Sequence, residues 1–208
     1  MDEAAVRGAY GDGAFEGLAR YAEILRGRGI EWGLIGPGEV GRLWERHILN
    51  SLAVLGWVGQ GATVVDVGSG AGLPGVPVAL VRPDVRVTLL EPNLRRSGFL
   101  SGVVEELGLA GQVQVVRARA EEHEGTYDVV LSRAVAPLAK LVGWCSPLMA
   151  PGGSLVALKG RSAVKELAAA GDALKAGRLK AQAHEVSVPG ADEPTWVVVM
   201  TRRSRKFS

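Results

Sequence analysis

The chain has 208 residues, of which 47% are hydrophobic and 22% are charged, and its formal net charge is +2. This balance predicts one globular domain, or one domain with a short extension, and excludes a disordered or collagen-like chain. The single cysteine, Cys145, excludes an internal disulfide framework and fits a reducing compartment such as the cytoplasm.

The chain shows no signal for export or for a membrane. Its start carries Asp2 and Glu3 and lacks a basic stretch followed by a long apolar run. No stretch reaches the roughly 18 uninterrupted apolar residues that a membrane helix needs. We therefore expect a soluble cytoplasmic protein without a membrane partner, and a monomer as the default state.

Two predicted helices precede the first strand. Residues 14–28 place apolar side chains such as Leu18 on one face at helical spacing. Residues 38–56 form a second helix in the same way, with Ile48 on its apolar face. Residues 1–60 are therefore predicted to be a helical extension.

From residue 63 onward, short apolar strands alternate with helices. The predicted strands are 63–68, 85–91, 113–118, 127–132 and 154–159, and the predicted helices are 93–107, 137–148 and 162–176. Two closing runs, 183–188 and 196–201, are joined by a loop and predict an antiparallel hairpin. The alternation predicts that residues 61–208 form one compact α/β domain, with a mostly parallel sheet covered on both faces.

A glycine-rich loop, DVGSGAGLPG at residues 66–75, follows the first strand directly. Glycines let a backbone turn sharply and approach a ligand closely, and ligands bind at the carboxyl ends of strands in this fold. Residues 70–75 also spell the G-x-G-x-x-G of dinucleotide binders, which alone is a weak signal. Asp66 favours a nucleoside without pyrophosphate, because a carboxylate repels phosphates and can pair with the amino group of a methionine moiety.

Two further segments predict contacts with that nucleoside. Glu91 ends the second strand, where an acid accepts hydrogen bonds from ribose hydroxyls; dinucleotide binders share this feature, and the alternative is a carboxylate at a helix N-terminus. The loop after the third strand lies beside the adenine in this fold, so the backbone of Ala120 and Glu121 can read the edge of the base. The alternative for the segment 117–122 is a solvated run of charges.

The fourth strand ends in Ser132-Arg133-Ala134, which lacks the Asn/Asp-Pro-Pro-aromatic motif of methyltransferases that modify exocyclic amines. Methylation of a pyrimidine carbon needs a thiolate, and Cys145 lies in an apolar helix, where a buried structural thiol is expected. The acceptor is therefore predicted to carry a ready lone pair, as guanine N7 does. Transfer to such an atom needs positioning and electrostatics but no general base.

Taken together, these residues resemble the family of bacterial small-subunit (16S) ribosomal RNA guanine-N7 methyltransferases, also called glucose-inhibited division protein B. The resemblance covers nearly the whole chain, and the segments that carry it are RHILNSL at 46–52, VGSGAGLPGVP at 67–77, LSRA at 131–134 and LKG at 158–160. It implies a Rossmann-like class I methyltransferase fold, the cofactor S-adenosylmethionine and a guanine in the decoding-centre loop of 16S rRNA. The substrate partner would be 16S rRNA or the small ribosomal subunit, and no metal is expected.

The resemblance also implies roles for individual residues. The family positions that contact S-adenosylmethionine correspond to Gly68, Leu73, Ala120, Glu121 and Arg133. The positions of the glycine loop and of the strand ends add Asp66, Gly70, Gly72 and Glu91 as predicted cofactor-binding residues. The family often has Asp where Asn50 stands, so any role of Asn50 must be hydrogen bonding.

Three residues are candidates for the catalytic site. His47 and Asn50 share a helix face and contact the RNA, the target base or the cofactor, unless they merely pack on the edge of the sheet. Arg133 can grip the carboxylate of the cofactor or donate to guanine O6 while N7 stays free. Its contact with one or the other stays open.

Basic residues gather late in the chain. Residues 1–150 hold 14 Lys and Arg against 17 Asp and Glu, whereas residues 151–208 hold 10 against 5. This asymmetry predicts a polyanionic partner, although a solvated helix face with a frayed end is the alternative. The predicted RNA-binding residues are Lys159, Arg161, Lys165, and Arg202, Arg203 and Arg205 of the basic tail, which also includes Lys206.

Two other functions stay open at this point. A nicotinamide-dependent oxidoreductase can use the same glycine loop, but no His or Tyr-Lys pair stands near the predicted cleft. A noncatalytic RNA-binding module can share the fold, but the intact loop and Glu91 argue against loss of the cofactor.

Overall fold

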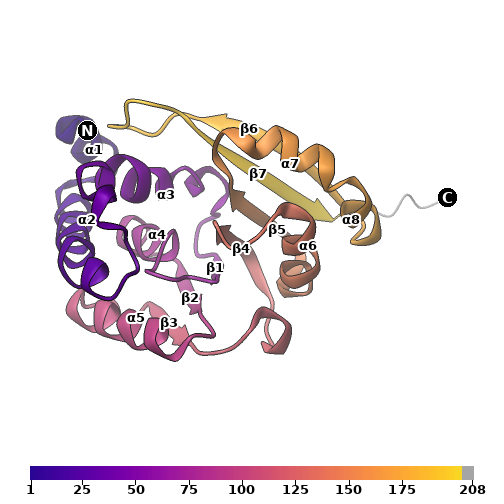
Figure 1. Cartoon of the computed structure of the whole chain (residues 1–208), viewed down its shortest axis with the longest axis horizontal. Coiled ribbons are helices and arrows are strands. Elements are labelled where there is room, and N and C mark those ends of the chain that lie inside the picture. The colour runs from indigo at the N-terminus through magenta and orange to yellow at the C-terminus, as the bar shows by residue number, and fades with distance from the viewer. Residues whose placement is uncertain (203–208) are drawn as a thin grey trace.

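A seven-stranded sheet forms the centre of the molecule in the computed structural model, which describes residues 1–202 (Figure 1). The strand order is β3-β2-β1-β4-β5-β7-β6. The strands are β1 (Thr63–Val67), β2 (Arg86–Leu90), β3 (Val113–Val116), β4 (Tyr127–Arg133), β5 (Met149–Leu158), β6 (Leu179–Val186) and β7 (Thr195–Arg202). Strands β1 to β5 pair in parallel, and β7 pairs antiparallel with both β5 and β6. The predicted α/β class and the closing antiparallel hairpin are therefore confirmed.

Helices cover both faces of the sheet. One group packs into a single hydrophobic core on one face, and its members are α1 (Glu3–Tyr10), α2 (Asp12–Ile24), α3 (Asn50–Leu52), α4 (Gly75–Val81) and α5 (Leu94–Glu106). The other group lies beside β4 to β7 in Figure 1, and its members are α6 (Leu138–Cys145), α7 (Ala163–Ala169) and α8 (Gly171–Ala176). Short single turns complete the connections, and they span Leu25–Gly29, Pro37–Arg42, Trp44–Leu49, Leu55–Trp57, Ala120–Glu122, Ser146–Leu148 and Gly160–Ser162.

The apolar strands supply two hydrophobic cores because successive side chains of a strand point to opposite faces. In β1, Val64 belongs to the core under α2, α4 and α5, whereas Val65 belongs to the core under α6 and α8. Strands buried on both faces read as continuous apolar runs, which is why their positions were predictable.

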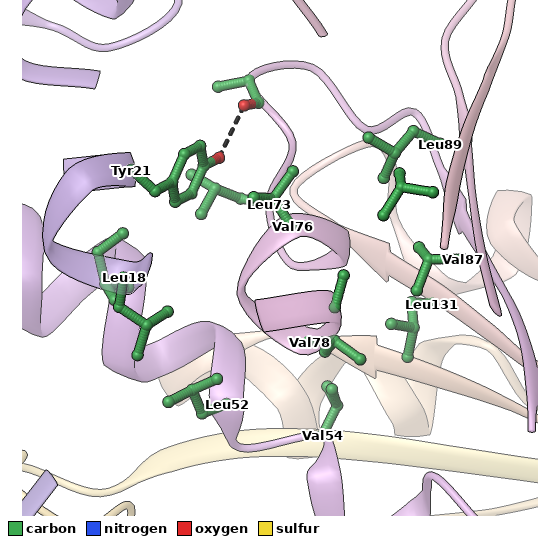
Figure 2. Close-up of a cluster of buried hydrophobic side chains, with 14 of the residues drawn as sticks. Leu18, Tyr21, Leu52, Val54, Leu73, Val76, Val78, Val87, Leu89 and Leu131 are labelled. Carbon is green, nitrogen blue, oxygen red and sulfur yellow. Dashed lines mark hydrogen bonds between the residues drawn. The ribbon is translucent and has the colours of Figure 1, made fainter. Parts of the chain in front are cut away.

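The predicted division at residue 60 does not separate two cores. Leu18 and Leu52 of the extension pack in one cluster with Val76, Leu89 and other residues of the sheet and α4 (Figure 2). The boundary at residue 60 stays a prediction about domain organisation. The packing means that the helical extension is held against the sheet by the same core that holds α4.

The segment predicted as a helix over 38–56 is helical, but it is not one regular α-helix. The segment consists of a 3-10 turn at Pro37–Arg42, a π-helical turn at Trp44–Leu49, the short α3 and a 3-10 turn at Leu55–Trp57. The carbonyl oxygen of His47 accepts hydrogen bonds from the hydroxyl of Ser51 at 2.6 Å and from Arg133 at 3.1 Å. These side-chain bonds compete with the regular helical ladder, and widened turns of this kind often occur at functional sites.

Other predicted helices differ at their ends. The helix predicted over 162–176 breaks at Ala170 into α7 and α8. The helix predicted over 137–148 ends at Cys145, because Pro147 follows in a 3-10 turn. Helix boundaries of this kind depend on local capping that apolar periodicity does not report.

Candidate functional site

The candidate site lies at the carboxyl edge of the sheet, where β1 and β4 are neighbours. The chain leaves β1 toward β2 on one side, and β4 lies on the other, so this is the switch point of the topology. Val67 at the end of β1 pairs with Ser132 near the end of β4. This register brings the glycine loop beside Arg133, although 65 residues separate Gly68 from Arg133 in the chain.

A cavity of about 190 Å³ opens beside the glycine loop. Its walls come from the ends of β1 and β2, the loops after β3 and β4, and α6. They consist of Val67, Gly68, Leu90, Pro92, Ala118, Arg119, Ala120, Glu121, Val135 and Trp144. Three of the predicted cofactor residues, Gly68, Ala120 and Glu121, therefore lie around one cavity. The lining is largely apolar, as expected of a nucleoside pocket.

The backbone of the glycine loop requires glycine at Gly70 and Gly72. Both have positive φ, +58° and +102°, where other residues are strained. A Cβ on Gly72 would lie 2.7 Å from Val76, so this glycine faces the protein. A Cβ on Gly70 would meet only a backbone oxygen at 3.8 Å, so this glycine faces open space. Gly70 is thus the position at which a ligand can approach the backbone.

The helical extension holds the loop from its other side. The hydroxyl of Tyr21 on α2 donates to the carbonyl oxygen of Ala71 at 2.7 Å (Figure 2). Tyr21 is fully buried, and burial raises the pKa of its hydroxyl well above the usual value. The phenol is therefore a permanent donor, and Leu73, buried in the same cluster, fixes the other half of the loop.

Glu91 braces the loop from the end of β2. It is 3% exposed, and its carboxylate accepts hydrogen bonds from the backbone N–H of Gly70 and of Asn93, each at 3.0 Å. Each carboxylate oxygen has a second lone pair, so these bonds leave capacity for hydroxyl donors. The predicted ribose contact stays a prediction, and the structure adds a role in holding Gly70.

Asp66 lies beneath the loop with no exposed surface. One carboxylate oxygen accepts from the backbone N–H of Gly75 at 3.0 Å, and the other has no partner among the described residues. Burial raises the pKa of Asp66 from 3.8 to about 7. Near neutral pH the carboxyl is thus only partly charged and does not face the cavity, so the predicted pairing with a ligand's amino group stays a prediction.

A second cavity of about 330 Å³ lies across the ends of β4 and β5. It brings together all three predicted catalytic residues, Arg133, His47 and Asn50. The remaining lining residues are Glu39, Arg46, Ala134, Leu158, Lys159, Gly160, Glu166 and Thr195. The side-chain oxygen of Asn50 is buried and has no partner among the described residues.

Arg133 is anchored by the helical extension at the edge of this cavity. Its guanidinium contacts Nδ1 of His47 at 2.6 Å, the carbonyl oxygen of His47 at 3.1 Å and the hydroxyl of Ser51 at 3.3 Å. Burial lowers the pKa of Arg133, but a guanidinium keeps its proton in proteins. Arg133 is therefore a fixed cation that cannot act as a base.

His47 uses both ring nitrogens within the protein. Its Nε2 lies 3.0 Å from one carboxylate oxygen of Glu39, and Arg46 donates to the other carboxylate oxygen at 3.0 Å. Burial, and then the charge of Arg133, lowers the pKa of His47, whereas Glu39 opposes that shift. The imidazole is accordingly neutral near neutral pH. Glu39 was not predicted from the sequence, because it precedes His47 by eight residues in a segment without a recognisable motif.

The predicted RNA-binding residues are in different surroundings. The side chain of Lys159 is 7% exposed, and its ammonium donates to the carbonyl oxygen of Ala136 at 2.6 Å and pairs with Glu166 at 2.9 Å. Arg161 is exposed and pairs with Glu193 at 3.1 Å, and Lys165 is exposed. Lys159 therefore fixes the loop after β4, and a contact with phosphate stays a prediction.

The start of the basic tail lies at the opposite edge of the sheet. Strand β7 runs antiparallel to β5, so Val197 pairs with Leu158 near the cavities, whereas Thr201 pairs with Ser154 farther back. Arg202 donates to the carbonyl oxygen of Ser146 at 2.9 Å at that far edge. Arg203 and Arg205 lie outside the described residues.

A third cavity, of about 610 Å³, adjoins the second and shares Arg46, Asn50, Gly160 and Thr195 with it. Arginines and acids both line this cavity, among them Arg42, Arg161, Glu45 and Asp192. Its lining comes from the helical extension, from the turn after β5 and from the loop before β7.

Other chemistries find no support in residues 1–202. No group of three or more His, Cys, Asp or Glu in this range is arranged to hold a metal ion. Cys145 is buried, as predicted, and burial raises the pKa of its thiol to about 12, so a thiolate nucleophile is not formed. None of the helices in the described range is both long enough and apolar enough to span a membrane.

Comparisons with known proteins agree with this geometry. Residues 14–194 match the family model described as rRNA small subunit methyltransferase G. A protein of that name from Kineococcus radiotolerans is 50% identical over 198 residues, which cover 94% of this chain and 77% of the relative. One from Mycobacterium avium is 56% identical over 153 residues, which cover 71% of this chain and 62% of the relative.

Solved structures that are more distant share the fold. Fibrillarin from Aeropyrum pernix, crystallised with natively bound S-adenosyl-L-methionine, superposes with a TM-score of 0.54 at 15% identity, covering 72% of this chain and 73% of its own. At this identity the likeness shows the Rossmann-like methyltransferase fold alone.

Proposed function

The chain belongs to the rRNA small subunit methyltransferase G family, and from this premise we propose that it transfers a methyl group from S-adenosylmethionine to N7 of a guanine in 16S rRNA. Family membership makes it a methyltransferase and argues against a nicotinamide-dependent oxidoreductase or a noncatalytic RNA-binding module. Beyond family membership, we propose the cofactor, the acceptor atom and the roles of single residues.

The glycine loop and the cavity beside it suit the cofactor. In the proposed arrangement the adenosine lies in the cavity lined by Gly68, Ala120 and Glu121, and Glu91 accepts from the ribose hydroxyls. Gly70 leaves room that a Cβ would fill, which is the space a ligand needs to approach the loop. When bound, S-adenosylmethionine supplies an electrophilic methyl group on a sulfonium sulfur.

The second cavity suits the acceptor base. It adjoins the end of β4, and its lining includes Asn50 and Arg133, whose guanidinium is held by His47 and Ser51. Enzymes that act on a nucleobase extrude it from the stack and read its hydrogen-bonding edge in a pocket. Arg133 can donate to guanine O6 while N7 stays free.

The observation that carries the choice of N7 is the lack of a free base among the residues that line this cavity. Arg133 stays protonated, and both ring nitrogens of His47 are engaged. The two carboxylates of the lining are also engaged, Glu39 with His47 and Arg46 and Glu166 with Lys159. Methylation of an amine or of a hydroxyl requires loss of a proton, whereas N7 attacks with a lone pair and loses none. The protein then contributes position, exclusion of water and a fixed positive charge near O6.

A titration with S-adenosylmethionine and with NAD tests the cofactor part. We expect S-adenosylmethionine to bind and NAD to bind much more weakly. Gly70→Val should lower the affinity for S-adenosylmethionine by at least about tenfold, because the side chain would occupy the approach to the loop. A matched control is Gly61→Val, since Gly61 has a similar φ of +65° and open surroundings but precedes β1 at the far edge of the sheet.

Unchanged affinity in Gly70→Val would refute this placement of the cofactor. An equal loss in Gly61→Val would mean that backbone strain, and not the ligand site, explains the effect. Tighter binding of NAD than of S-adenosylmethionine would overturn the proposed reaction.

A further inference from the structure

Three side chains from different parts of the chain form a continuous row beside the second cavity. Glu39 comes from the turn Pro37–Arg42, His47 from the turn Trp44–Leu49 and Arg133 from the end of β4. Glu39 contacts Nε2 of His47 at 3.0 Å, and Nδ1 of His47 contacts the guanidinium of Arg133 at 2.6 Å. These contacts connect the half-exposed carboxylate of Glu39 to the guanidinium of Arg133 through the ring of His47.

We propose that Glu39 is a positioning residue for methyl transfer, because it holds His47 in the one ring form that can accept a hydrogen bond from Arg133. The proposal rests on the proposed function, in that it assigns Arg133 to the reacting groups. Glu39 itself touches neither substrate nor cofactor in this account.

The ring form follows from the donors and acceptors. A guanidinium can only donate, so Nδ1 of His47 must carry a lone pair. A neutral imidazole with a lone pair on Nδ1 has its proton on Nε2. The group facing Nε2 must then accept, and the carboxylate of Glu39 can only accept when it is ionised. One arrangement therefore satisfies all three groups.

The arrangement fixes the plane of the guanidinium. The same arginine also donates to the carbonyl oxygen of His47 and to Ser51, so three acceptors from the turn Trp44–Leu49 and α3 hold it. An arginine held in this way presents its remaining N–H groups in a set direction, which matters for contact with a planar carboxylate or with O6.

The charged groups around His47 show why the ring must stay neutral. Glu39 faces it from the turn before, Arg46 from its own turn and Arg133 from β4. A second proton on the ring would occupy Nδ1, remove the acceptor of Arg133 and place a cation against the guanidinium. Tyr21 and Asp66 lie behind Arg133 and act on its charge, but neither contacts the ring.

A contribution to folding stability does not explain the contacts of Glu39. Its side chain is 31% exposed, and its partner Arg46 is 51% exposed, so their ion pair contributes little to stability. Removal of Glu39 should consequently leave the fold intact while it loosens Arg133. A structural role and a positioning role thus predict different outcomes.

The first test determines which ring nitrogen of His47 carries the proton, and it needs no enzymatic activity. The chain has three histidines, so ¹⁵N spectra of the imidazoles can be assigned with His47→Asn as the reference. We expect the wild-type ring near neutral pH to carry its proton on Nε2. In Glu39→Ala the pKa of His47 should fall further, because the hydrogen bond and charge of Glu39 raise it. A proton on Nδ1 in the wild type, or an unchanged pKa in Glu39→Ala, would overturn the proposal.

The second test is a double-mutant cycle on single-turnover methylation. His47→Asn offers an amide oxygen that can accept from Arg133 without any choice of ring form. Glu39→Ala should lower the rate on the order of tenfold in the wild-type background, the equivalent of one partly exposed hydrogen bond to a charged group. In the His47→Asn background the same change should have no further effect.

The control is Glu23→Ala, which removes another carboxylate of the extension that pairs with an arginine, Arg26, away from the cavities. It should leave the rate and the ring of His47 unchanged. Equal losses from Glu39→Ala in both backgrounds, or no loss in either, would refute the positioning role. If wild-type protein transferred no methyl group, the proposed function would fail, and the ring spectra would still decide the role of Glu39.

Discussion

The buried carboxyl of Asp66 should make folding stability depend on pH in an unusual direction. Burial raises the pKa of Asp66 from 3.8 to about 7, so the folded chain binds a proton that the unfolded chain has lost between these values. The resulting stabilisation is fully present below about pH 4 and is lost as the pH rises through about 7. Asp66→Asn removes the titrating group while its amide oxygen can still accept from Gly75.

The size of the effect follows from the shift. Each pKa unit corresponds to about 1.4 kcal/mol, so the free energy of unfolding of the wild type should fall by roughly 2 to 3 kcal/mol relative to Asp66→Asn between pH 5 and pH 8. The assay is chemical denaturation of both proteins at pH 5, 6, 7 and 8. Any constant cost of the amide cancels, because only the change with pH is compared. Parallel curves would refute the claim that Asp66 is uncharged in the folded protein at low pH.

Three further predictions concern the reaction and the RNA. The single-turnover rate should be flat from roughly pH 7 to 9 and should fall below the ordinary histidine pKa of 6.5, as His47 gains a proton. The rate of His47→Asn should not fall in that acid range. A rate that depends on a group titrating above pH 7 would contradict transfer without a base. Arg133→Lys keeps the charge but loses the planar fork, so it should cost about tenfold in rate, and Arg133→Ala about a hundredfold; a fully active lysine variant would mean that charge alone matters. Neutralising the four charges of the basic tail should reduce the salt dependence of RNA binding, by up to about 3 in the log–log slope, and should leave cofactor affinity unchanged; an unaltered slope would show that the tail is not in contact with RNA.

The strands of this fold were predictable because burial on both faces leaves a pattern of continuous apolar runs. The glycine loop was predictable as well, since Gly70 and Gly72 need backbone angles that other residues rarely adopt. The turns around His47 were not, because the bonds that widen them come from Ser51 and from Arg133, which lies 86 residues away. Apolar periodicity carries no information about such contacts.

The residues of the candidate site were predictable only in part, because contacts between distant segments leave no local pattern in the sequence. Arg133, His47 and Asn50 were expected on the resemblance and do line one cavity. Glu39 was missed, because nothing in its local sequence indicates that its carboxylate meets a ring nitrogen of His47. The ion pair of Lys159 with Glu166 was missed as well, since the local sequence around Lys159 does not indicate that a carboxylate lies against it in the fold.

The most direct test of the central claim is the identity of the methylated nucleoside. Small ribosomal subunits or 16S rRNA that lack the modification are incubated with the protein and isotopically labelled S-adenosylmethionine, digested to nucleosides and analysed by mass spectrometry. The label is predicted to appear in 7-methylguanosine and to be strongly reduced with Arg133→Ala. Label in any other nucleoside, or none in the RNA at all, would contradict the account.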